Sequence, residues 1–365
     1  MTPPIRAHLA NLAPVVHGSI DDAELSALGL GRDQIIDFSV NSNPLGSSPA
    51  AVEAARHAIW SHYPDDHARL LRRALAERNQ VDERAVVVGN GSSELIWLIA
   101  LAFLDPDNAA LIVGPTFGEY ARAIRIVNGI VHEYRANAAT GFAVDLAAVV
   151  EHAQAVDARL VFLCNPNNPT GTLLSTSQLA LLARAVPRTL VVVDEAYRPF
   201  VDDPPVTIPL LEHGNVVLLR SLTKDYALAG LRLGYALAPG EIVAALDRVR
   251  PPWSVNAVAQ AAGLAAIADD AHLERARAEV RLARDYLTTT LRALGFRVMP
   301  STANYLLVEV GNAGEVRRQL LRRAVCVRDC TSFGLPEHIR IGMRPVADCR
   351  RLTTAFAVIK SDGIC

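Results

Sequence analysis

The chain has 365 residues, 51% of them hydrophobic, and a formal net charge of −2. This length allows a large domain and a smaller one, and the balanced charge is untypical of proteins that bind nucleic acid. The densest apolar run, Leu95–Leu104, is about half as long as a membrane-spanning helix and predicts a buried helix instead. We therefore expect a small-molecule ligand, with neither a nucleic-acid nor a membrane partner.

The cysteines indicate neither a disulfide framework nor a metal centre. Their number is odd, none forms a C-x-x-C pair, and no histidine cluster lies near them in the sequence. The first residues also lack the apolar stretch of a signal peptide. We expect a cytoplasmic protein that binds no metal. The cysteines are Cys164, Cys326, Cys330, Cys349 and Cys365.

Residues 1–33 are mixed in character and predict an N-terminal arm, whereas residues 34–250 alternate between short apolar runs and helical patterns. The runs lack polar alternation, which is typical of strands buried on both faces of a parallel sheet. This region predicts a large α/β domain whose helices sandwich a mainly parallel sheet. The predicted strands are Ala85–Val88, Ala109–Val113, Leu160–Leu163, Leu190–Val193 and Val216–Leu219, and the predicted helices include Ala50–Trp60, Glu94–Phe103 and Ser177–Ala185.

A smaller α/β domain is predicted for residues 251–365. Pro251-Pro252 separates it from the first region, and the Ala-, Arg- and Glu-rich stretch Ala257–Ala293 then predicts two helices. The tail alternates in pattern after that stretch. It predicts strands at Phe296–Met299, Tyr305–Val310 and Ile339–Met343, a helix at Gly314–Ala324, and a last helix near the end.

Unusual polar residues follow four of the predicted strands of the large domain. Open α/β sheets bind ligands at the carboxyl ends of their strands. After the first strand, Gly91 allows a ligand to approach the backbone, and a helix start at Ser92 and Ser93 favours an anion such as phosphate. Taken alone, a helix N-cap by either serine explains this segment equally well.

Two further strand ends carry side chains suited to a polar ring. The loop Cys164–Gly171 contains two prolines and three asparagines, among them Asn168, and is more specialised than a plain turn requires. Asp194 follows an all-apolar strand, where a carboxylate needs a cationic partner. The protonated pyridine nitrogen of pyridoxal phosphate (PLP) is one such partner. A salt bridge to a protein arginine is the alternative.

The fourth strand end carries a candidate nucleophile. Lys224 closely follows the strand Val216–Leu219, and near other cations its pKa would be depressed, so that its amine could attack an aldehyde. Arg232 could pair with a phosphate. A single lysine is usually a solvated surface charge, but its place beside the other three strand ends favours the functional interpretation.

Together these motifs resemble the class I and II aminotransferase family, the PLP enzymes of fold type I. The match runs from Asn41 to Arg344, and three motifs carry it in order: Asn165–Gly171, Asp194–Tyr197 and Ser221–Lys224. The resemblance implies a large PLP-binding domain, a smaller C-terminal α/β domain, and pyridoxal 5'-phosphate as the cofactor.

The resemblance also implies roles at matching positions. Lys224 would bind the cofactor aldehyde and then move the substrate proton, and Asp194 would keep the pyridine nitrogen protonated. Asn168 and Tyr197 would hydrogen-bond the ring oxygen. Phe117 would stack on the ring, with ordinary core packing as the alternative. The residues implied for the phosphate and its cradle are Gly91, Ser92, Ser93, Ser221 and Arg232.

Beyond the cofactor, the resemblance implies a homodimer and a substrate-anion site. Tyr63 resembles the tyrosine that each subunit of this family donates across the dimer interface. Arg340 matches the family's substrate-anion arginine, and Arg328 is a second candidate. Two guanidinium groups could bind a carboxylate and a phosphate.

Two branches of the family stay open. Tyr63–Asp65 and Leu228–Tyr235 resemble histidinol-phosphate aminotransferases, which use 2-oxoglutarate and serve histidine biosynthesis. His17-Gly18, Phe117–Tyr120 and Arg220–Lys224 are closer to the threonine-phosphate decarboxylases of cobalamin synthesis. Both branches use the cofactor to stabilise a carbanion at the α-carbon of a phosphorylated substrate. Because transamination is the commoner outcome of this motif set, we expect the aminotransferase.

Two alternative interpretations of the sequence belong to other classes of protein. Ser221–Lys224 is also an S-x-x-K motif and Ser254–Asn256 imitates the second motif of penicillin-binding enzymes, but no Lys-Thr-Gly occurs in the chain. A serine acyltransferase is therefore a remote alternative. A regulator that only binds PLP would need a separate DNA-reading module, and the first residues are too few and too weakly basic for one.

Overall fold

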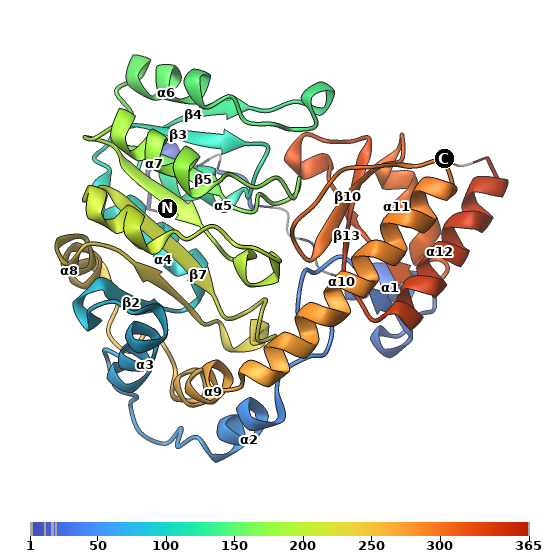
Figure 1. Cartoon of the computed structure of the whole chain (residues 1–365), viewed down its shortest axis with the longest axis horizontal. Coiled ribbons are helices and arrows are strands. Elements are labelled where there is room, and N and C mark those ends of the chain that lie inside the picture. Colours follow the sequence, from blue (N-terminus) through green and yellow to red (C-terminus); the bar gives the residue numbers. More distant parts are fainter. Residues whose placement is uncertain (1–2, 11, 16–17, 19, 364–365) are drawn as a thin grey trace.

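Two α/β domains joined by the long helix α10 (Asp270–Ala293) make up the computed structural model (Figure 1). The structure describes residues 3–10, 12–15, 18 and 20–363. His17 and Cys365, which the sequence analysis singled out, lie outside these residues. The described cysteines are free thiols.

The large domain contains a seven-stranded sheet in the order β2-β8-β7-β6-β5-β3-β4. Only β8 runs antiparallel to its neighbours among these strands, so the sheet is mainly parallel as expected. The strands are β2 (Val86–Gly89), β3 (Ala109–Gly114), β4 (Ile130–Arg135), β5 (Leu160–Cys164), β6 (Leu190–Asp194), β7 (Val216–Ser221) and β8 (Gly234–Leu237).

Helices cover both faces of this sheet. Val191 and Val193 of β6 pack on one face with α3, α6, α7 and α9, while Val192 packs on the other with α4, α5 and α8. A strand buried on both sides has no polar position, which explains the continuous apolar runs of the sequence. The helices are α2 (Pro49–His57), α3 (Arg69–Asn79), α4 (Gly91–Phe103), α5 (Glu119–Ile126), α6 (Leu146–Ala155), α7 (Thr176–Ala185), α8 (Gly240–Val249) and α9 (Ala257–Ile267).

β4 and β8 are not predicted by the sequence patterns. β4 is an edge strand with the polar pair His132-Glu133 at its middle, and three of its six residues are exposed and three are half-buried. β8 has only four residues, and it begins with the glycine of a motif that was interpreted as a phosphate-binding segment. Both strands therefore lack the long apolar run that identified the other five.

The small domain is built from both ends of the chain. Its four-stranded sheet has the order β12-β13-β10-β9, and a second pair joins β1 to β11 in parallel. In Figure 1, α1 from the N-terminal region lies beside the C-terminal helices. The elements are α1 (Asp22–Ala27), β1 (Ile36–Asp37), β9 (Arg297–Val298), β10 (Tyr305–Glu309), α11 (Ala313–Leu321), β11 (Val325–Cys326), β12 (Arg328–Asp329), β13 (His338–Gly342) and α12 (Val346–Ser361). The domain boundaries at residues 33 and 250 stay a prediction.

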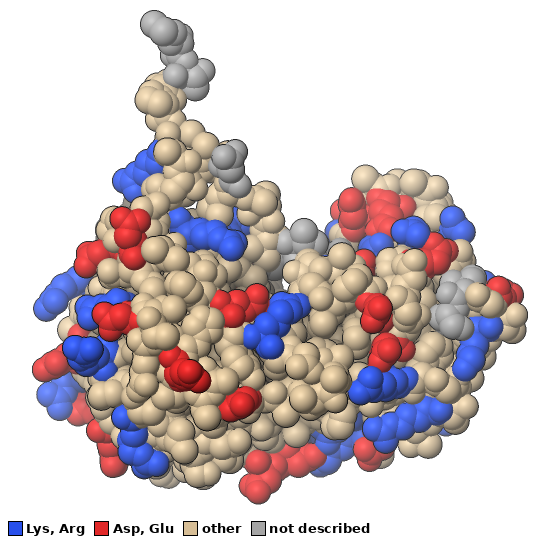
Figure 2. Space-filling view, turned by 90° about the horizontal axis from the view of Figure 1, so that it is seen from above, with Lys and Arg blue, Asp and Glu red and all other residues tan. Residues whose placement is uncertain are grey.

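Basic and acidic side chains are interspersed on the face of the molecule shown in Figure 2. This face therefore carries no broad field of one sign. Among the described residues, no helix is both long enough and apolar enough to span a membrane.

Candidate active site

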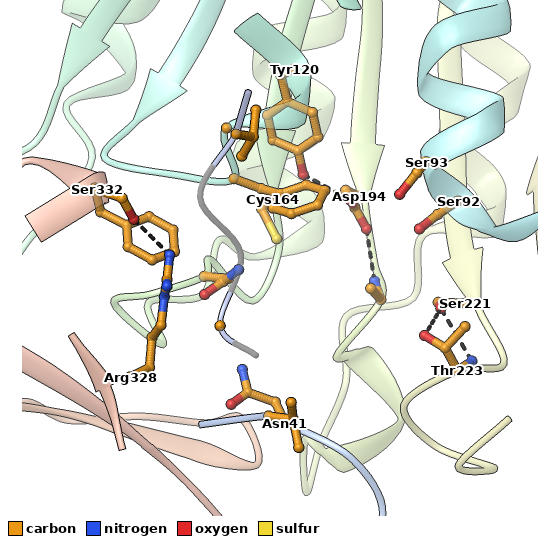
Figure 3. Close-up of a pocket in the computed structure, with 18 of the residues that line it drawn as sticks. Asn41, Ser92, Ser93, Tyr120, Cys164, Asp194, Ser221, Thr223, Arg328 and Ser332 are labelled. Atoms are coloured by element: carbon orange, nitrogen blue, oxygen red, sulfur yellow. Dashed lines mark hydrogen bonds between the residues drawn. The ribbon is translucent and has the colours of Figure 1, made fainter. Parts of the chain in front are cut away.

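A cavity of about 750 Å³ lies where the carboxyl ends of β5, β6 and β7 meet the small domain (Figure 3). This volume is within the range of small-molecule sites. Eleven of the residues singled out from the sequence line it: Ser92, Ser93, Phe117, Asn168, Asp194, Tyr197, Ser221, Lys224, Arg232, Arg328 and Arg340. The chain thus brings together side chains from segments that are far apart in the sequence.

The start of α4 lies at one end of the cavity and is suited to an anion. Ser92 and Ser93 extend from the first turn of α4 toward the cavity in Figure 3, where the helix N–H groups lack partners within the helix. Gly91 has a φ of 78°, and a Cβ built on it would lie 2.8 Å from Nη2 of Arg232. Glycine therefore leaves room for the guanidinium beside the two serines.

Asp194 ends β6 and is 4% exposed. Its Oδ1 accepts a hydrogen bond from the Ala196 N–H at 3.0 Å, and its Oδ2 accepts one from the Tyr120 hydroxyl at 2.7 Å. Burial raises the pKa of Asp194, and these two hydrogen bonds oppose that rise. The carboxylate is therefore fixed in orientation and suited to a cation at the cavity side.

Lys224 follows β7 on a loop that is held from two sides. The Lys224 carbonyl accepts the Asn43 N–H at 2.7 Å, and the hydroxyls of Ser221 and Thr223 lie 2.7 Å apart. Burial, followed by the charges of Arg340 and Arg232, lowers the pKa of Lys224 to about 8. A sizeable fraction of the amine is thus neutral and nucleophilic near neutral pH.

Arg340, on β13, connects the small domain to Asn168, in the loop after β5. Its Nη1 donates to Oδ1 of Asn168, and its Nη2 donates to the Ser39 carbonyl at 2.8 Å. Its Nε is buried and makes no hydrogen bond to a described residue. Nearby, burial raises the pKa of Tyr197 to about 12, so its phenol stays protonated and can donate a hydrogen bond.

Arg328, on β12, lies across the cavity from Asp194 in Figure 3. Its Nη2 donates to the Ser332 hydroxyl at 2.6 Å, and its guanidinium lies 5.5 Å from the centre of the Phe333 ring. Burial, followed by the charge of Arg340, lowers its pKa. Two buried guanidinium groups therefore face one cavity, an arrangement suited to an anionic substrate.

Tyr63 does not reach this cavity within its own chain. Its side chain is 79% exposed and stacks on Trp253, with ring centroids 4.5 Å apart. Phe117 lines the cavity and also makes an edge contact with Tyr120 at 5.7 Å, so it both packs and faces a ligand.

Sequence reasoning missed several residues of the site. Tyr120 is the most important, because it contacts Asp194 across 74 positions of sequence. No spacing rule predicts such a contact, although Tyr120 lies only three positions after Phe117. Others that line the cavity are Asn41, Arg125, Cys164, Thr223, Ser332 and Phe333.

Comparison with known proteins decides the family. The sequence profile described as "Aminotransferase class I and II" matches residues 33–356. The chain belongs to this family. Ser221 ends β7, whereas the serine of an S-x-x-K acyltransferase motif should open a helix. The position of Ser221 therefore does not support the serine acyltransferase alternative.

Three individual likenesses cover nearly the whole chain. A histidinol-phosphate aminotransferase from Symbiobacterium thermophilum is 40% identical over 98% of this chain and 99% of its own. The crystal structure of histidinol-phosphate aminotransferase from Sinorhizobium meliloti in complex with pyridoxal-5'-phosphate has a TM-score of 0.89 at 23% identity, covering 99% of both chains. L-threonine-O-3-phosphate decarboxylase from Porphyromonas gingivalis has a TM-score of 0.79 at 28% identity, covering 90% of this chain and 100% of its own.

Pyridoxal 5'-phosphate is the cofactor of this aminotransferase family, and the cavity fits it. A half-buried lysine with a lowered pKa suits its aldehyde, and a buried carboxylate suits its pyridinium nitrogen. The glycine at position 91 leaves space for Arg232 beside a helix N-terminus, which suits its phosphate. The donor set therefore matches each polar part of the cofactor.

Proposed function

We propose that the protein transfers the amino group of L-histidinol phosphate to 2-oxoglutarate. The observation that supports this most strongly is the 40% identity to a histidinol-phosphate aminotransferase along almost the full length of both chains. The lining of the cavity agrees with it, because Arg328 and Arg340 supply two cationic groups for a phosphate or carboxylate.

The bound cofactor supplies an electron sink that stabilises negative charge at the substrate α-carbon. Lys224 Nζ would then take the proton from the substrate α-carbon and hold it for the next transfer, because a pKa of about 8 makes this amine both an acceptor and a donor. Asp194 would keep the pyridine nitrogen protonated, while Asn168 and Tyr197 would donate to the ring oxygen. The cofactor phosphate would be held by Ser92, Ser93, Ser221 and Arg232. Gly91 lacks a side chain and so leaves space for the guanidinium of Arg232.

Arg328 and Arg340 orient the substrate. Arg340 is held in place by hydrogen bonds to Asn168 and to the Ser39 carbonyl. Binding of the substrate anion to Arg340 would therefore be coupled to Asn168, which would contact the cofactor ring. Ser332 and Phe333 fix the guanidinium of Arg328. Because the bond that breaks would be the one perpendicular to the cofactor ring, the way in which these two arginines hold the substrate would decide between loss of a proton and loss of carbon dioxide.

The working protein is a cytoplasmic homodimer in this proposal. Tyr63 stands on an exposed loop whose base is held by the Trp253 N–H donating to Asp66 at 2.7 Å. The exposed rings of Tyr63 and Trp60 offer a second copy an apolar contact, and Tyr63 would reach the phosphate of the neighbouring subunit's cofactor.

A second candidate is decarboxylation of threonine O-phosphate, which the likeness to the Porphyromonas gingivalis enzyme favours. The deciding experiment gives the purified holoenzyme histidinol phosphate with 2-oxoglutarate, and separately threonine O-phosphate with detection of carbon dioxide. We expect glutamate from the first mixture and no carbon dioxide from the second. Carbon dioxide without glutamate would replace the aminotransferase with the decarboxylase. Histidinol and threonine without phosphate serve as matched controls for the role of the anion.

A further inference from the structure

A second cavity, of about 210 Å³, shares Ser221 with the active-site cavity but is otherwise separate from it. It lies among α3, the loop after β6, the loop after β7, and the start of α10. Its volume is more than ten times the roughly 10–15 Å³ that one water molecule needs. We call it the arginine chamber, because four arginines line it: Arg78, Arg198, Arg220 and Arg277.

The inner pair of these arginines shares one carboxylate. Glu195, 1% exposed, lies 2.8 Å from Nε of Arg220 and 3.6 Å from Nε of Arg198. Burial and the charges of Arg220 and Arg277 lower the pKa of Arg198, against the effect of Glu195. One buried anion therefore serves two half-buried cations.

The other acids near the chamber compensate these charges only weakly. Arg78 and Arg277 pair with Asp270 and Glu274, whose side chains are 69% and 60% exposed, so water screens both pairs. Burial raises the pKa of Asp225, the other acid lining the chamber, to about 7, which weakens the negative charge that it contributes near neutral pH.

Arg277 also has unused hydrogen-bonding capacity. Its Nη atoms donate to Glu274 and to the Val201 carbonyl, but its Nε is buried and makes no hydrogen bond to a described residue. This Nε is closed to solvent, so a ligand in the chamber would instead use the second N–H of each Nη atom, since a guanidinium carries five N–H donors.

We propose that the arginine chamber binds a small oxyanion of the phosphate type. Guanidinium groups bind tetrahedral oxyanions through paired N–H donors, and four of them line a space large enough for one. The reaction proposed above uses none of these arginines, so this is a second site rather than part of the first. An anion bound there would stabilise the folded holoenzyme and would lie beside the segment Ser221–Tyr226 that carries the cofactor lysine.

The test must separate this site from the substrate-anion site. In the Arg328→Gln background, with the cofactor bound, inorganic phosphate replaces sodium chloride at constant ionic strength while the thermal midpoint is measured. We expect a saturable rise of the midpoint. In Arg277→Gln/Arg328→Gln, half-saturation should need at least about tenfold more phosphate, because one charged donor is lost.

A matched control lies one turn along α10. Arg281 pairs with Asp202 at 3.4 Å and does not line the chamber, so Arg281→Gln/Arg328→Gln should keep the phosphate response of the background. An unchanged half-saturation in the Arg277 variant, or no saturable rise in the background, would overturn the proposal.

A second measurement does not depend on the folding of any variant. Crystals of the unaltered holoenzyme are soaked in selenate, a tetrahedral oxyanion that scatters anomalously. We expect an anomalous peak among Arg198, Arg220 and Arg277. A peak confined to the neighbourhood of Arg328, with none in the chamber, contradicts the inference.

Discussion

At the scale of single residues, the proposed reactivity of the site rests on Lys224. Burial and two arginines lower its pKa, and Asp194 opposes them. The folded chain therefore holds an amine that is partly neutral at the pH at which Asp194 must be charged. A surface lysine, with a pKa of about 10.4, would be almost entirely protonated there.

The rate at which the apoenzyme takes up PLP should follow the neutral fraction of this amine. We expect the rate to rise with pH, to reach half of its limiting value near pH 8, and to level off about one unit above that, where most of the amine is neutral. Stopped-flow absorbance of the cofactor measures it. Lys224→Ala should lose the visible absorption band and nearly all turnover. A rate that keeps rising toward pH 10, or a yellow and active Lys224→Ala protein, would contradict the assignment.

Tyr120→Phe removes one of the two hydrogen bonds of Asp194. Loss of a bond to a charged group is worth roughly 1.5–3 kcal/mol, so kcat should fall by about 10- to 100-fold. The fold should persist, because the ring still stacks on Phe162 with centroids 5.1 Å apart.

Tyr134→Phe is the matched control for that change, because its hydroxyl accepts the Asp145 N–H at 2.9 Å and it does not line the cavity. Asp194→Ala, with the carboxylate itself removed, should cost more than Tyr120→Phe. The absorbance of the bound cofactor as a function of pH should shift in Tyr120→Phe and not in the control. Equal spectra in both variants would mean that the Tyr120 hydroxyl serves the fold alone.

At the scale of elements, the junction between β2 and α4 depends on one glycine. Gly91→Ala should weaken PLP binding at least about tenfold, because the new methyl group would displace Arg232. It should also cost about 1–2 kcal/mol of stability, since φ at this position is 78°. Titration of the apoenzyme with PLP and thermal unfolding measure the two effects.

Gly240 provides the control for this junction, because it also begins a helix. It begins α8, its φ is not positive, and a Cβ there would meet no atom closer than 3.8 Å. Gly240→Ala should leave PLP affinity unchanged. If both alanine variants bind PLP alike, the backbone at position 91 has no special role.

Much of the architecture was predictable at this scale. The buried strands β3, β5, β6 and β7 were identified to within two residues at either end, because a strand covered on both faces has no polar residue to break its pattern. Sequence patterns did not identify the edge strand β4 or the two-residue strands β1, β11 and β12, because these strands are defined by pairing with partners elsewhere in the chain. The strand-end polar residues could be predicted for the same reason, whereas Tyr120 and Ser332 enter the site only through packing.

At the scale of the whole molecule, the loop after α2 predicts an interface. Ile59, Trp60 and Tyr63 are 69%, 82% and 79% exposed, an unusual density of large apolar groups on a surface. We expect a dimer by sedimentation velocity, and Trp60→Asp should shift it toward monomer. Leu181→Asp, at an exposed apolar residue on α7, should leave the dimer intact. A monomeric parent protein would exclude the proposed role of Tyr63 in the neighbouring cofactor site.

The hydrogen bond between Arg340 and the Ser39 carbonyl spans 301 positions of the chain. A ribosome that adds roughly 5–20 residues per second needs about 15–60 s to pass from one to the other. During that time the strands β2 to β8 can pair with one another. β1 and Ser39 cannot pair yet, because their partners β11 and Arg340 have not been translated. A polypeptide truncated before β13 would therefore contain every strand of the large sheet but would lack Arg340, one of the two arginines proposed to bind the substrate.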